Sequence, residues 1–170
     1  AVEPHWNEMR TLVTDSAQQF KPIPATPFDT LRNSRFMKEV MEVYEVGKNL
    51  TEEQKAIADF WDCNPYKMNI TGHVSPGGHW INIATQILKT TKADFVKTTQ
   101  VYALVSMGLY EGFISCWDEK YRSNLIRPES IINEYIDQEW RPMIQTPPFP
   151  EYTSGHSVVS AVSSTMLTSV

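Results

Sequence analysis

Cysteine is nearly absent from this chain, because Cys63 and Cys116 are the only two among its 170 residues. Two thiols so far apart in the sequence form neither a disulfide framework nor a zinc site by themselves. The sequence leaves open whether they pair with each other, and it therefore does not decide the redox compartment.

A surplus of positive charge is also missing. The chain has 15 lysines and arginines against 20 aspartates and glutamates, which gives a formal net charge of −5 at pH 7. This balance excludes a broad basic surface of the kind that binds a nucleic acid backbone, so we expect no nucleic acid partner. Any site for an anion must be local.

Long apolar stretches are lacking as well. Residues 152–170 carry no Lys, Arg, Asp or Glu, but serine and threonine interrupt this segment throughout, so it is too polar to span a membrane. Hydrophobic residues nevertheless make up 41% of the chain and aromatic residues 11%, which suffices for a globular core. We expect a soluble chain, with residues 1–170 belonging to one helical domain.

What the sequence does contain is helical periodicity without strand-like alternation, so the expected fold class is all-α. Thr51 and Gln54 form a capping box at one helix start. Gly108 and Gly112 share a face of the longest helix, where they either let another helix approach or are merely tolerated. The expected elements are a helix over 34–46 stopped by Gly47, a helix between the capping box and Pro65, a loop over 71–80, and helices over 81–88, 93–126, 131–139 and 157–170.

The last helical pattern reaches Val170 without a glycine or a polar tail. Native chain ends are more often polar and capped. We therefore expect the chain to be a fragment of one helical catalytic domain, and a natural frayed helix end is the alternative.

Lys120 and Arg127 form the first candidate anion-binding pair. Seven helical steps return to nearly the same face with a rise of roughly 10.5 Å, a gap that two long side chains can close around one ligand. Pro128 disfavours helical geometry at Arg127 and so places its guanidinium at the end of an element. The same spacing also arises by chance on solvated helices, so the pair needs a second motif beside it.

The second motif is PPFPEYTSGH, residues 147–156. Its prolines favour a rigid turn, and Thr153 or Ser154 is the expected N-cap of the last helix. Free amides, a hydroxyl and the positive end of the helix dipole favour an anion there, and Gly155 lets the backbone approach it closely. His156 beside such an anion is suited to general acid and base catalysis, whereas a structural hydrogen bond is the alternative role.

Together the two motifs resemble the superfamily of type-2 phosphatidic-acid phosphatases, bacterial acid phosphatases and vanadium-dependent haloperoxidases. The signature of that superfamily is K-x6-R-P, then S-G-H, then S-R-x5-H-x3-D. Lys120, Arg127 and the run Ser154, Gly155 and His156 match its first two parts. Trp117 and the PPFP run are similar to the soluble haloperoxidase branch, in which a chloroperoxidase has Phe at the position of Phe149 and a bromoperoxidase has His.

The resemblance implies a helical bundle of the acid phosphatase and vanadium haloperoxidase type with one oxyanion pocket. In that pocket Lys120, Arg127, Ser154 and Gly155 would hold vanadate or phosphate, and His156 would be the catalytic proton donor and acceptor. Trp117 and Phe149 would line the pocket. The implied activities are oxidation of a halide by hydrogen peroxide with vanadate as cofactor, or hydrolysis of a phosphate ester through a phospho-histidine with no cofactor.

The third motif does not follow His156 in this sequence. In the family it supplies the histidine that is bonded to vanadium or that attacks phosphorus. We therefore expect a bundle that is incomplete at its C-terminus, with a second chain carrying the motif as one expected partner. The alternative function is a helical binding or scaffold domain with a vestigial oxyanion site. A periplasmic or extracellular location is expected by family analogy alone.

Overall fold

The computed structural model describes residues 3–64 and 74–170, and within these ranges the chain is helical and contains no strand. The predicted all-α class is confirmed. No helix in the described ranges is long and apolar enough to cross a bilayer. The elements are η1 (Trp6–Glu8), a 3-10 helix, and the α-helices α1 (Arg35–Lys48), α2 (Glu52–Phe60), α4 (Pro76–Thr90), α5 (Phe95–Ser123), α6 (Pro128–Tyr135) and α7 (Gly155–Thr168).

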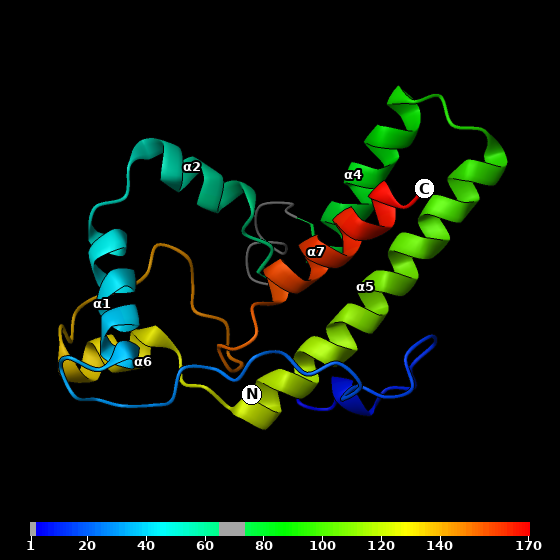
Figure 1. The fold of residues 1–170 in the computed structure, drawn as a ribbon. Coiled ribbons are helices and arrows are strands. Elements are labelled where there is room, and N and C mark those ends of the chain that lie inside the picture. The colour runs from blue at the N-terminus through cyan, green and yellow to red at the C-terminus, as the bar shows by residue number, and fades with distance from the viewer. Residues whose placement is uncertain (1–2, 65–73) are drawn as a thin grey trace.

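The long helix α5 is the axis of the fold, and α4 and α7 run beside it (Figure 1). The expected single helix or helix pair over 93–126 is one unbroken helix, capped at its start by the side chain of Asp94. Buried aliphatic side chains from all three helices form one core cluster: Ala84, Leu88, Val101, Val105, Leu109 and Val159.

Two glycines of α5 bring α7 close, which decides between the two alternatives for these positions. A Cβ atom on Gly108 would lie 2.6 Å from Cγ1 of Val162, and one on Gly112 would lie 3.3 Å from Cγ2 of the same valine. A side chain at Gly108 would push α7 outward. The close approach holds the start of α7, and with it the S-G-H motif, against α5.

A second core cluster joins α1 and α6 around Trp140. Gly47 was expected to stop α1, but the helix continues through it to Lys48. A Cβ atom on Gly47 would lie 2.9 Å from Cζ2 of Trp140, so the residue is glycine because the indole packs against its backbone. The capping box at Thr51 and Gln54 is confirmed at the start of α2.

The prediction of a loop over 71–80 is wrong for residues 76–80, which form the start of α4. Ser75 is the N-cap of α4 and accepts a hydrogen bond from the amide of Gly78, and Pro76 occupies the first helical turn. Proline fits that position because its missing N–H would have no helical partner there. Residues 71–73 of the expected loop lie outside the described residues.

The connection after α5 also differs from the expectation. α5 ends at Ser123, where Asn124 adopts a left-handed conformation with φ 48°, and α6 begins at Pro128 and ends at Tyr135 rather than running over 131–139. Arg127 is therefore the residue before α6 and does not share a helix with Lys120. At the other motif, Ser154 is the N-cap of α7 and accepts a hydrogen bond from the amide of Ser157.

Candidate functional site

The residues predicted from the two motifs all line one cavity of about 450 Å³. They reach it from the last turns of α5, the start of α6, the PPFP turn and the first turn of α7. These predicted residues are Trp117, Lys120, Arg127, Phe149, Ser154, Gly155 and His156. Side chains that the motifs did not indicate also line it, among them Trp6, Cys63, Phe113 and Glu151.

Lys120 is buried, with 1% of its surface exposed. Its Nζ donates hydrogen bonds to the backbone oxygens of Pro150 at 2.9 Å and Glu151 at 3.1 Å. Burial lowers the pKa of Lys120 to about 8, and the charge of Arg127 acts in the same direction. The ammonium is thus held against the turn that precedes α7, and among the described residues two of its three N–H groups have acceptors, which leaves one for a ligand.

Arg127 is held by the same turn. Its Nε donates to the oxygen of Phe149 at 2.7 Å and its Nη2 to the oxygen of Pro150 at 3.3 Å. Its Nη1 lies 2.5 Å from Oε2 of Glu151, in a partly buried ion pair. The turn at 149–151 therefore binds both cations, Lys120 from α5 and Arg127 from the residue before α6.

The ring of Phe149 lies close to both of these charges. Nζ of Lys120 and Cζ of Arg127 are each 5.0 Å from its centroid, and the ring of Trp117 is 5.0 Å away. Cation–π attraction of this kind stabilises a cation by about 0.5–2 kcal/mol. Phe149 therefore positions both side chains while it gives the cavity an apolar surface.

The first turn of α7 supplies the remaining predicted groups. Ser154 and His156 are exposed, and Gly155 is half-buried. A Cβ atom added to Gly155 would lie 3.7 Å from Cζ3 of Trp117. Nε2 of His156 lies 2.9 Å from the backbone oxygen of Trp61. Since a carbonyl only accepts, Nε2 carries the proton, and Nδ1 is the nitrogen left for a ligand.

Both cysteines are free thiols, which settles the open question of their pairing. Burial raises the pKa of Cys63 and of Cys116, so neither is activated as a thiolate. Among residues 3–64 and 74–170, no three His, Cys, Asp or Glu side chains are grouped to hold a metal ion.

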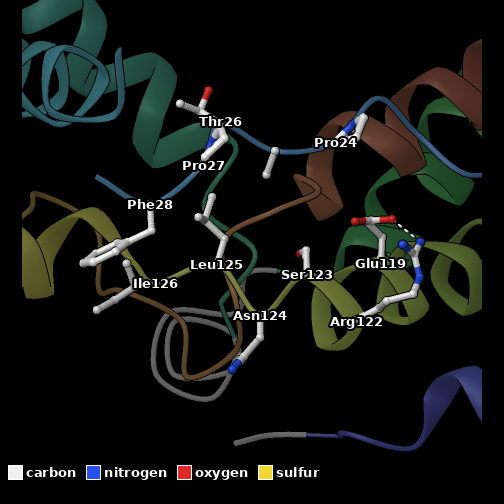
Figure 2. A pocket seen from close by; sticks show the side chains of 11 residues that line it. Pro24, Thr26, Pro27, Phe28, Glu119, Arg122, Ser123, Asn124, Leu125 and Ile126 are labelled. Atoms are coloured by element: carbon white, nitrogen blue, oxygen red, sulfur yellow. Dashed lines mark hydrogen bonds and ion pairs between the residues drawn. The ribbon is translucent and has the colours of Figure 1, made fainter. Parts of the chain in front are cut away.

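A second cavity of about 450 Å³ lies between the 24–28 segment and the end of α5 (Figure 2). Its charged side chains are Glu119 and Arg122, which form an ion pair with each other. Arg122 also pairs with Asp118 at 3.2 Å. Among the described residues that line it, this cavity has none of the predicted site residues, and its one cation, Arg122, is already paired.

The two motifs gave no indication that Trp6 lines the cavity. Trp6 belongs to a three-residue 3-10 helix far from both motifs in the sequence, and only tertiary packing brings it to the cavity. Glu151 belongs to the PPFPEYTSGH motif. Its pairing with Arg127 depends on the conformation of the turn, which the sequence alone does not predict.

Comparison with known proteins locates this fold among haloperoxidases. Residues 133–170 match a family model described as the VCPO second helical-bundle domain. A solved structure, described as the first bacterial vanadium-dependent iodoperoxidase, is 50% identical over 99% of this chain, with a TM-score of 0.93. The chain spans 41% of the length of that protein. No curated protein matches it.

Proposed function

Because the chain belongs to the vanadium haloperoxidase superfamily, we propose that its cavity binds a tetrahedral oxyanion in a haloperoxidase-type enzyme. The reaction proposed is the oxidation of a halide by hydrogen peroxide with vanadate as cofactor. The observation that carries this proposal is that Lys120 of α5 and Arg127, the residue before α6, line the same cavity as the N-terminus of α7.

The donor set suits vanadate. Lys120, Arg127, the Ser154 hydroxyl and the Gly155 amide are hydrogen-bond donors or can act as such, and a helix N-terminus adds partial positive charge. These groups would hold the oxygens of the anion. When bound, vanadate would supply the centre at which peroxide is activated toward a halide.

The chain's own residues would then handle charge, protons and water. The two cations offset negative charge on the bound anion. His156, oriented by the Trp61 carbonyl, would accept or deliver a proton through Nδ1 at an oxygen of that anion. Trp117 and Phe149 would keep water away from one side of the anion.

Hydrolysis of a phosphate ester is the second candidate. Phosphate is a tetrahedral anion like vanadate, so the same hydrogen-bond donors suit it. In this reaction His156, in the first turn of α7, would protonate the leaving oxygen of the ester. A helical scaffold with a vestigial anion site is the third possibility.

The test measures iodide and bromide oxidation by hydrogen peroxide, with and without vanadate, beside hydrolysis of p-nitrophenyl phosphate. It uses the chain alone and a longer form that carries the S-R-x5-H-x3-D motif. We expect vanadate-dependent oxidation that is lost in His156→Ala. Hydrolysis without oxidation would assign the phosphatase reaction instead, and oxidation that His156→Ala leaves unchanged would contradict the proposed role of the histidine. Absence of both activities in the longer form would favour the scaffold.

A further inference from the structure

The segment 149–153, which leads into α7, is neither helix nor strand, and side chains bind its backbone. Every carbonyl from Phe149 to Thr153 accepts a hydrogen bond from a side chain. Arg127 and Lys120 bind the first three of these carbonyls. A carbonyl that is shielded from water and lies outside regular structure needs such a partner. The segment is therefore placed by side chains and not by a ladder of backbone hydrogen bonds.

The last two carbonyls are bound by residues whose identity neither motif specifies. The hydroxyl of Ser123 donates to the oxygen of Tyr152 at 3.2 Å. The thiol of Cys116 donates to the oxygen of Thr153 at 3.7 Å, and its Sγ lies 3.4 Å from Oγ1 of the same threonine. Both contacts join α5 to the residues directly before α7.

Cys116, Lys120 and Ser123 share one face of α5, because spacings of four and three residues return to the same side of a helix. Lys120 binds the segment at residues 150 and 151, and the other two side chains bind it at residues 152 and 153. Thr153 directly precedes Ser154, the N-cap of α7. This face of α5 therefore determines both where Lys120 meets the segment and where α7 begins.

These two side chains act from outside the proposed site. Among the described residues that line the cavity of Lys120 and Arg127, neither Ser123 nor Cys116 occurs. Ser123 borders the second cavity instead, at the end of α5 (Figure 2), and Cys116 is buried, with 2% of its surface exposed. Any effect that either residue has on a bound anion must pass through the segment 149–153.

Resting on the proposed oxyanion binding, we propose that Ser123 and Cys116 are positioning residues of the oxyanion site. Ser123 holds the carbonyl next to that of Glu151, and so it fixes the turn to which Nζ of Lys120 is bound. Cys116 holds the residue before the N-cap, and so it fixes the amides at the start of α7. Together they set the lysine and the helix N-terminus to face the same anion.

The test measures the dissociation constant of inorganic phosphate by calorimetry for the parent chain and for Ser123→Ala. We expect the affinity to fall about fivefold, the effect of one neutral hydrogen bond. Ser123→Thr keeps the hydroxyl and should bind phosphate like the parent chain. Ser106→Ala, at an exposed position of the same helix, is the matched control and should leave the affinity unchanged. Equal affinities of the parent chain and Ser123→Ala would overturn the role of Ser123, whereas a parent chain that binds no phosphate would contradict the proposed function instead.

A double-mutant cycle separates positioning from a general loss of stability. If Ser123 acts through Lys120, Ser123→Ala should weaken phosphate binding by only about twofold or less in a Lys120→Met background. A fivefold loss in both backgrounds would show that Ser123 acts independently of Lys120, and it would overturn the inference for this residue.

Cys116→Val tests the second positioning residue, because it removes the donor with little change in volume. Since Cys116 acts through the start of α7, we expect the loss of phosphate affinity to be about threefold both in the parent chain and in Lys120→Met. Unchanged affinity in Cys116→Val would overturn the role of Cys116. If this variant does not fold, Cys116→Ala removes the same donor and takes its place in the comparison.

Discussion

Arg127 and Glu151 pair inside the cavity, with Nη1 of the guanidinium 2.5 Å from Oε2 of the carboxylate. The side chain of Glu151 is 37% exposed and that of Arg127 19%. The carboxylate thus occupies a donor that the proposed oxyanion needs, and its charge repels an incoming anion.

Replacement of Glu151 by glutamine should therefore strengthen oxyanion binding. We expect phosphate affinity to rise roughly tenfold, about 1.4 kcal/mol, because one opposing charge near the ligand is removed. Calorimetry at pH 6.5 keeps Lys120 charged in both proteins. Glu139→Gln, at an exposed position, is the control for a simple change of net charge. A weaker affinity in Glu151→Gln would mean that the carboxylate positions Arg127 rather than competing for it.

Oxyanion binding should weaken as the pH rises through about 8. Burial lowers the pKa of Lys120 to about 8, so the free protein carries a charged ammonium below that pH and loses the charge above it. The bound anion favours the charged form, so affinity is highest on the acidic side. Sulfate is the probe, because it does not titrate in this range. Lys120→Arg should remove the decline, since arginine stays charged; a decline that persists in this variant would assign the titration to another group.

The two roles of Ser154 can be separated by substitution. Its hydroxyl accepts from the amide of Ser157 at 3.2 Å, so Ser154→Ala should cost about 1 kcal/mol of stability. Ser154→Asp keeps a good N-cap but puts a negative charge at the proposed anion site. We expect it to unfold in urea like the parent chain and to bind phosphate at least tenfold more weakly. Undiminished phosphate binding in Ser154→Asp would exclude the start of α7 from the site.

The contact between α5 and α7 should be sensitive to any side chain larger than hydrogen at position 108. A methyl group there would meet Val162 at 2.6 Å and Met166 at 3.2 Å, and overpacking of this kind costs about 1–3 kcal/mol. We expect Gly108→Ala to lower the free energy of unfolding, measured in urea, even though alanine favours helix by about 1 kcal/mol. Gly112→Ala, with its nearest atom at 3.3 Å, should be close to neutral. Adding Val162→Ala should restore part of the loss; a Gly108→Ala protein as stable as the parent would show that α7 moves away freely.

Local signals in the sequence predicted much of the fold. The capping box at Thr51 and the periodicity of α5 act over a few residues, and the structure confirms both. Of the two candidate caps, Thr153 and Ser154, it is Ser154 that caps α7. The spacing of Gly108 and Gly112 on one helix face left open whether they let another helix approach, and the structure shows that they do.

The errors came from signals with two meanings or with distant causes. Pro76 was assigned to a loop, although proline also suits the first turn of a helix. Gly47 predicts a helix stop, but a glycine stands at this position because the indole of Trp140 packs against its backbone. Trp6 joins the cavity only through tertiary packing on Phe113 and Trp117. For the site itself, the two motifs and the family resemblance that they carry predicted which residues line the cavity, but not the turn at 149–151 that binds both cations.

Equilibrium binding of orthovanadate to the parent chain and to Lys120→Met at pH 7 tests whether the oxyanion site exists. We expect one bound vanadate per chain, with phosphate competing for it. In the variant the affinity should fall at least tenfold, because one charge-assisted hydrogen bond, worth about 1.5–3 kcal/mol, is lost. Vanadate that binds the two proteins equally, or that phosphate does not displace, would contradict an oxyanion site between Lys120, Arg127 and the start of α7.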